Sequence, residues 1–156
     1  SFFLDAYAFS TEAVIGHTIG KRSEKSFLQA VTNSFLLSVI SSLIISLIYL
    51  FSFKFIVNQL TDIDYLRYLA LNYFFWIVII PPIASFCYQF DGIFIGASQT
   101  AEMRNGMVIS VIIFITSSHY LVNNFGNHGL WLSLTFFMVL RSITLNFYFN
   151  RILKNF

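Results

Sequence analysis

Long stretches without charged residues dominate the chain, and short charged segments separate them. No charged residue lies from Ser26 to Phe53 or from Tyr68 to Phe90. Each stretch is long enough for a helix to cross the ~30 Å hydrocarbon core of a bilayer. Two further apolar stretches cover 106–122 and 130–149, the second interrupted only by Arg141. The pattern predicts an all-α membrane protein, a polytopic helical bundle.

The spacing of these stretches predicts about four full spans and one partial helix in a single, partial membrane domain over residues 1–156. The expected helices are 1–20 (partial), 29–53, 64–97, 105–122 and 129–150. The chain opens at Ser1 directly in an apolar helical pattern. We therefore expect it to be a carboxy-terminal piece of a longer protein.

The third expected helix is too long for one straight span. At ~1.5 Å per residue, 64–97 would measure roughly 50 Å. Pro81 and Pro82 lack amide donors and predict a kink there. The carbonyls that they free, near Ile77 and Val78, would need other partners in a membrane. Polar residues at 61–64 are expected to cap the start of this helix.

Composition supports a membrane protein and argues against several other classes of protein. Charged residues make up 10% of the chain, against about 25% in soluble domains. The net charge of +2 and the absence of a basic patch argue against a nucleic-acid partner. The three histidines and one cysteine lack metal-ligand spacing, and no nucleophile–base pair stands out. We expect no metal, no cofactor and no enzymatic activity.

The distribution of lysine and arginine predicts an orientation. Cytoplasmic loops of membrane proteins carry an excess of these residues. With the 21–25 loop inside, six cations lie inside and two outside. We expect a multi-pass protein of the bacterial plasma membrane with a cytoplasmic carboxy terminus. The inside residues are Lys21, Arg22, Lys25, Arg104, Arg151 and Lys154, and the outside ones are Lys54 and Arg67.

Acidic residues inside apolar helices are candidate functional sites, because they are costly to bury in a membrane. Asp5 and Glu12 are seven residues apart and share one helix face. Small residues such as Ala8 and Gly16 flank them and permit close helix packing. One interpretation is a carboxylate pair on a polar cavity; in the other, Asp5 lies near the interface and only Glu12 is deep.

Asp91 is a third intramembrane acid. Tyr88 and Gln89 precede it and could help it bind a cation or proton. Arg141 is expected at a similar depth, so a structural ion pair between Asp91 and Arg141 is the alternative. Both interpretations remain open at this point.

Four stretches together resemble the multidrug and toxic compound extrusion (MATE) transporters, in their DinF-type branch. The first stretch is 4–20, which ends in Gly16-His17-Thr18-Ile19-Gly20, and the second is Leu60-Thr61-Asp62. The third is Phe90-Asp91-Gly92-Ile93-Phe94-Ile95-Gly96-Ala97-Ser98-Gln99-Thr100. The fourth is 126–133 together with Leu140-Arg141, and all four follow the order of the family's pattern. His17 stands where the family usually has glutamine. In other branches of the family, the cation site uses an acid further up the tenth helix, at a position near Ala84 here, so Asp91 is not its direct counterpart.

The resemblance implies a fold of twelve helices in two lobes, of which this chain holds most of the carboxy-terminal one. It implies an antiporter that uses Na⁺ or H⁺ to export drugs or other amphipathic organic compounds, with Glu12 as the main coupling residue. Phe9, Tyr88 and Gln89 are the candidates for the substrate cavity, within an aromatic wall that includes Tyr73, Phe74 and Trp76. The partners would be the lipid bilayer and the missing amino-terminal lobe.

Two other functions stay open. A lipid-linked sugar flippase of the same wider superfamily would need several cationic side chains for pyrophosphate, and only Arg141 is available. A membrane packing subunit that transports nothing would keep its activity after Glu12→Gln or Asp91→Asn.

Overall fold

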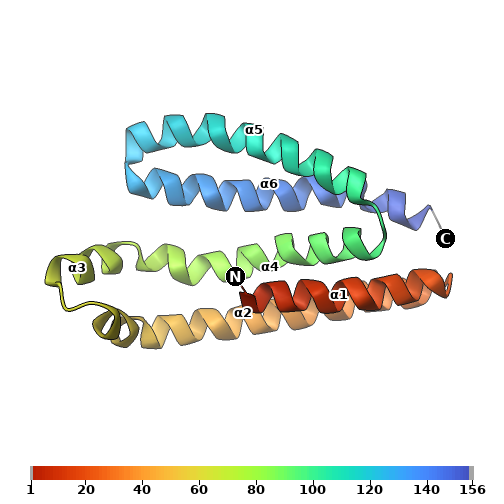
Figure 1. Ribbon diagram of the computed structural model, residues 1–156, viewed down its shortest axis with the longest axis horizontal. Helices are drawn as coiled ribbons and strands as arrows, with labels where there is room; N and C mark the ends of the chain where they lie inside the picture. Colours follow the sequence, from red (N-terminus) through yellow and green to blue (C-terminus); the bar gives the residue numbers. More distant parts are fainter. Residues whose placement is uncertain (1, 155–156) are drawn as a thin grey trace.

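The computed structural model describes residues 2–154 and contains six helices there, with no strand (Figure 1). Four of them, α2, α4, α5 and α6, are long and apolar enough to cross a membrane. This confirms the expected all-α membrane fold with four spans. The helices are α1 Phe2–Gly20, α2 Glu24–Leu60, α3 Asp64–Asn72, α4 Phe74–Gly96, α5 Thr100–Phe125 and α6 Asn127–Leu153.

The long helices run up and down the bundle, and α4 lies in the middle (Figure 1). It packs on α1 and α2 on one side and on α6 on the other, while α5 packs mainly on α6. We call the end with residues 21–23 and 97–99 the core end, and the end with 61–63 and Gly126 the distal end. The six cations expected inside all belong to segments at the core end, where Arg151 Nη1 lies 3.2 Å from Glu102 Oε1.

Helices α2, α5 and α6 extend beyond their expected bounds, and the long third helix expected over 64–97 is divided in two. Helix α2 covers 37 residues, because its polar ends at 24–28 and 54–60 remain helical. The interruption between α3 and α4 falls at Tyr73, whereas Pro81 and Pro82 lie inside the continuous helix α4. The chain thus breaks at Tyr73, and the kink expected at Pro81 and Pro82 stays a prediction.

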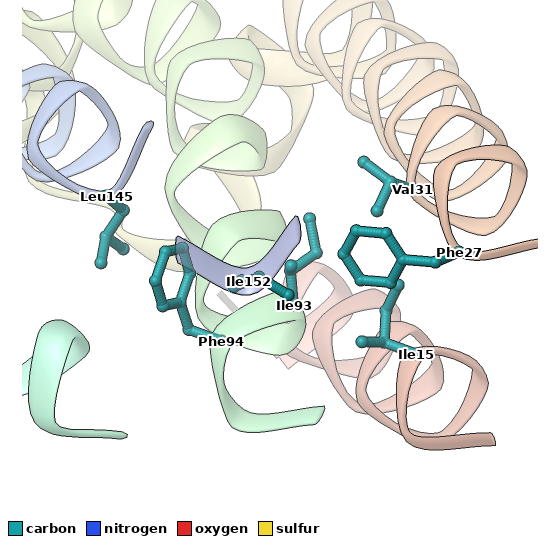
Figure 2. Packing of buried hydrophobic residues seen from close by; sticks show 7 residues of the cluster. All are labelled: Ile15, Phe27, Val31, Ile93, Phe94, Leu145 and Ile152. Atoms are coloured by element: carbon teal, nitrogen blue, oxygen red, sulfur yellow. The ribbon is translucent and has the colours of Figure 1, made fainter. Parts of the chain in front are cut away.

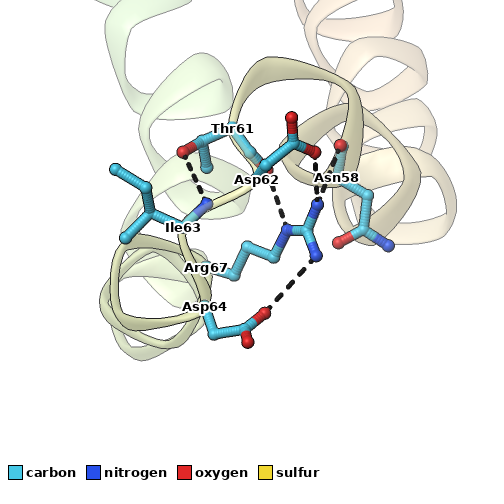
Figure 3. A network of polar contacts seen from close by, with 6 residues as sticks. All are labelled: Asn58, Thr61, Asp62, Ile63, Asp64 and Arg67. Atoms are coloured by element: carbon cyan, nitrogen blue, oxygen red, sulfur yellow. Dashed lines mark hydrogen bonds and ion pairs between the residues drawn. The ribbon is translucent and has the colours of Figure 1, made fainter.

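Contacts on either side of Tyr73 account for the position of the break. Arg67 holds α3 to the end of α2: its Nε donates to Thr61 O at 2.8 Å, and its Nη2 lies 3.2 Å from Asp62 Oδ1 (Figure 3). Beyond the break, the Phe74 ring packs against Phe53 of α2 at 4.9 Å between centroids. The two helices are thus fixed to α2 separately, and the chain changes direction between them.

The start of α3 is not capped as expected. Ile63 occupies the cap position and makes no side-chain cap bond. Thr61 Oγ1 instead accepts from the Ile63 amide at 3.3 Å (Figure 3). Arg67 also donates to Asn58 O, so its guanidinium binds carbonyls left open at the end of α2.

The helix continues through the two prolines because one of the freed carbonyls finds a partner on α2. Pro82 cannot donate to Val78, four residues before it. Ser46 Oγ donates to Val78 O at 2.7 Å, and Ser46 is buried. This replaces a hydrogen bond that the surrounding lipid could not supply.

The hydrophobic core gathers at the core end of the bundle. Figure 2 shows Ile93 and Ile152 between Phe27 on one side and Phe94 with Leu145 on the other. These side chains come from α2, α4 and α6, and Ile15 adds α1. These side chains are at most 1% exposed, and Val31 of α2, in the same cluster, is 9% exposed. The core therefore joins the α5–α6 hairpin to the other helices at this end.

Helices α1 and α4 approach each other closely at two glycines one turn apart. A Cβ added to Gly92 would clash with the Ala8 carbonyl, and one added to Gly96 would lie 2.6 Å from Glu12 O. Both neighbours are backbone atoms, which cannot move aside as a flexible side chain can. Small residues four apart permit this kind of helix contact in membranes.

We predict that Gly92→Ala and Gly96→Ala each destabilise the full-length protein. The added methyl must separate α1 from α4, and overpacking typically costs about 1–3 kcal/mol. The measurements are membrane abundance and thermal stability in detergent. Gly20→Ala is the matched control, because no atom lies within 4 Å of its added Cβ. Equal stability of all three variants would contradict the close contact.

We also predict that Ser46→Ala lowers the melting temperature. Val78 O would lose its partner, and interhelical hydrogen bonds in membranes contribute about 0.6–2 kcal/mol. Ser38→Ala serves as the control, because Ser38 is also buried in α2 but its Oγ has no hydrogen-bond partner among the described residues. A Ser38→Ala effect as large as that of Ser46→Ala would argue against the proposed role of the Val78 bond.

Candidate functional site

The candidate acids line one cavity of about 170 Å³ between α1 and α4. Met103 of α5 closes part of its wall. The structure thus brings Asp91 together with Asp5 and Glu12, the pair that the sequence had placed on one helix face. The lining residues are Asp5, Ala8, Phe9, Glu12, Tyr88, Asp91, Gly92, Ile95 and Met103.

Helical spacing and the glycine contact together form this cavity. On α1, Asp5 and Glu12 lie two turns apart on the face toward α4. On α4, Tyr88 and Asp91 share a face. Because the α1 backbone touches Gly92, side chains from both helices are drawn to the same space.

Arg141 of α6 contacts Asp91 at ion-pair distance. Its Nη2 lies 2.9 Å from Asp91 Oδ2, and the two side chains are 13% and 12% exposed. Asp91 Oδ1 and Arg141 Nε are buried without a hydrogen-bond partner within residues 2–154. The contact joins α6 to the cavity wall and leaves one carboxylate oxygen of Asp91 unused.

The other two carboxylates have no counter-ion in the part of the chain that the structure describes. Asp5 and Glu12 are half-buried and make neither an ion pair nor a side-chain hydrogen bond there. Three carboxylates and one guanidinium carry a formal charge of −2 when all are ionised. Such an excess favours a cation or protonation of an acid.

Gln89 lies outside the cavity, although the sequence suggested it as a lining residue. It is fully buried in the seam between α1 and α4, where Thr11 Oγ1 lies 2.8 Å from Gln89 Oε1. The same hydroxyl lies 2.8 Å from Tyr7 O. Since a hydroxyl has one proton, it donates to one of these two acceptors at a time. Gln89 thus links the two helices behind the cavity.

The expected aromatic wall is divided among three places. Phe9 and Tyr88 line the cavity, with Phe9 69% exposed. At the distal end, Trp76 Nε1 donates to His128 Nδ1 at 3.1 Å, and the Tyr73 ring lies 4.8 Å from the His128 ring. Phe74 packs on α2. A continuous aromatic wall is therefore absent from the described residues.

Sequence reasoning missed the residues that shape the site from behind. Gly92 and Gly96 have the four-residue spacing of a close helix contact, and that signal was available. Thr11 gave no such signal, because its partner Gln89 lies on another helix. Met103 lies in the first turn of α5, so its contact with the cavity depends on the turn at 97–99.

Comparison with known proteins found a matching family model and similar proteins. A family model described as MatE matches residues 2–123. DNA damage-inducible protein F of Escherichia coli (strain K12) is 36% identical over 145 residues, covering 93% of this chain and 31% of that protein. Protein DETOXIFICATION 42 of Arabidopsis thaliana is 24% identical over 142 residues, covering 91% of this chain and 28% of its own length. No solved structure matches the chain at a significant level.

We predict that Asp91→Asn and Arg141→Gln each lower the stability and abundance of the full-length protein. Removing one member of a buried pair leaves the other charge uncompensated, at about 3–5 kcal/mol. The double variant should lose less than the two single losses combined, and a double-mutant cycle of thermal stability measures this coupling.

Arg151→Gln is the control for this cycle. Arg151 forms the more exposed pair with Glu102, its own side chain being 61% exposed, and exposed pairs contribute about 0–1 kcal/mol. Strict additivity of the Asp91 and Arg141 losses would show that the two side chains do not interact.

Proposed function

The chain belongs to the MatE family, and from that premise we propose that the full-length protein is a secondary transporter. It exports drugs or other amphipathic organic compounds across the membrane in exchange for a cation or a proton. The observation that carries the proposal is the cavity in which three carboxylates meet with only one cationic partner.

The unbalanced charge of this cavity supports a coupling role. A cation or proton that binds there reduces the repulsion among the carboxylates. Moving one elementary charge through a membrane potential of 100 mV releases about 2.3 kcal/mol. Binding on one side and release on the other would let the protein use this energy.

We assign the main coupling role to Glu12, with Asp5 and Asp91 assisting. Glu12 is half-buried and has no ion-pair partner among the described residues, so its charge is free to take up Na⁺ or H⁺. Asp91 already shares its charge with Arg141. Phe9 and Tyr88 offer the apolar surface for an amphipathic organic cation, since aromatic faces attract such ligands.

The chain spans less than a third of the length of the curated relatives that it matches. We propose that an amino-terminal lobe completes the protein and that the acidic face of α1 and α4 turns toward it. Two lobes that rock about a shared cavity would give alternating access. The excess of lysine and arginine at the core end supports a plasma-membrane protein with this end in the cytoplasm.

The alternatives receive less support. A flippase for lipid-linked sugars would need free cationic groups in the cavity, yet Arg141 is engaged with Asp91 and no lysine or arginine is among the lining residues. A packing subunit would have no use for Asp5 and Glu12 without counter-ions, because such carboxylates only cost free energy in a membrane.

We predict that Glu12→Gln reduces drug efflux by the full-length protein at least tenfold. Tenfold corresponds to about 1.4 kcal/mol of lost ion binding. Proteoliposomes with an imposed Na⁺ or proton gradient and a fluorescent organic cation measure the initial rate. Glu24→Gln, an exposed acid at the start of α2, is the matched control and should keep the normal rate. Unchanged transport by a stable Glu12→Gln protein would exclude the proposed role.

A further inference from the structure

Arg141 and Asp91 each have a hydrogen-bonding atom that their mutual contact does not use. Arginine and carboxylate commonly form two parallel hydrogen bonds. Here a single contact is made, from Nη2 to Oδ2, and the buried Asp91 Oδ1 and Arg141 Nε have no partner within residues 2–154. Burying a polar atom without a hydrogen-bond partner costs free energy. The pair is therefore held less firmly than its burial suggests.

The unused oxygen belongs to a residue that lines the cavity. Asp91 is buried and borders the same space as Asp5 and Glu12. An ion that enters this space meets three carboxylates, one of which already neutralises a guanidinium. The ion and Arg141 therefore compete for the negative charge of Asp91.

Displacement of Arg141 would act on the attachment of α6. The Arg141–Asp91 contact is the one ion pair that joins α6 to α4 in the described part of the chain. Near the core end, Leu145 and Ile152 also hold α6 in the hydrophobic core. Toward the distal end, Trp76 of α4 donates a hydrogen bond to His128 of α6. Loss of the ion pair would leave the middle of α6 without a polar tie to α4.

We propose that Arg141 is a tethered internal cation that the coupling ion displaces from Asp91, releasing α6 from α4. The inference rests on the proposed function, because it assumes that a cation or proton enters the cavity. Without the ion, Arg141 neutralises Asp91 and holds α6 in place. With Na⁺ or H⁺ bound, Asp91 no longer needs the guanidinium, and Arg141 is solvated by water that reaches the pair.

The opposite arrangement makes a different prediction. If Arg141 and the ion bound to separate oxygens of Asp91 at the same time, the arginine would help to organise the site. Ion binding would then keep α6 against α4, and removal of Arg141 would weaken the response. The direction of the change thus separates displacement from joint binding.

The test measures the distance between α4 and α6 by double electron–electron resonance in the full-length protein. Spin labels at Phe75→Cys and Leu130→Cys occupy exposed positions at the distal ends of these helices. Adding NaCl in place of choline chloride, or lowering the pH from 8 to 5.5, should raise the ratio of long to short distances at least about fivefold.

Variants of Arg141 test whether its release from Asp91 causes the change in the α4–α6 distance. Arg141→Gln should show the long distance without the ion and respond little to it, whereas Arg141→Lys, which keeps the charge, should still respond. If Arg141→Gln is unstable, the Asp91→Asn/Arg141→Gln double variant, which leaves no unpaired charge, should show the same long distance. A short distance in these variants, or a distance that the ion does not change in the unaltered protein, would overturn the inference.

Transport by Glu12→Gln, measured in parallel, keeps the two proposals apart. Reduced efflux together with a fixed α4–α6 distance would reject the displacement of Arg141 and leave the transporter proposal intact. Unimpaired efflux in Glu12→Gln would reject the proposed coupling role of Glu12, whatever the distance measurement shows.

Discussion

The contact between the α1 backbone and the glycines of α4 is the constraint on which the arrangement depends. Because Gly92 and Gly96 have no side chain, Ala8 and Glu12 lie directly against α4. The same contact brings the acidic faces of both helices to one cavity. Hydrophobic burial cannot drive helix association in lipid, so close packing of this kind must supply much of the attraction.

Hydroxyl and amide groups hold the inner seams together where lipid offers no hydrogen bonds. Ser46 supplies the donor that Pro82 lacks, and Thr11 meets Gln89 across α1 and α4. Such contacts let α4 keep two prolines and a glutamine within a membrane-crossing segment. The polar residues of the apolar stretches are thus mainly structural, while the carboxylates of the cavity stand apart because most of their charge is unmatched.

The sequence predicted those parts of the structure that depend on composition and depth, and missed those that depend on distant contacts. Long uncharged stretches were enough for the four spans, and similar depth was enough to suggest that Asp91 could meet Arg141. The break at Tyr73 could not be found this way, because it follows from how Arg67 and Phe74 attach to α2. Likewise, helix spacing placed Asp5 and Glu12 on one face, but only the packing of α1 on α4 showed that Asp91 shares their cavity.

The hydrophobic core lies at one end of the bundle, so it holds the α5–α6 hairpin at that end and the hairpin can tilt about it. Leu145 lies in the core and His128 at the far end, 17 residues away in α6, or about 26 Å at ~1.5 Å per residue. A tilt of about 10° around the core would therefore move the far end by about 4–5 Å, from the same helix geometry. The single residue Gly126 between α5 and α6 leaves little slack, so both helices would swing together. A displacement of ångströms there would need hardly any rearrangement of the packed side chains at the pivot.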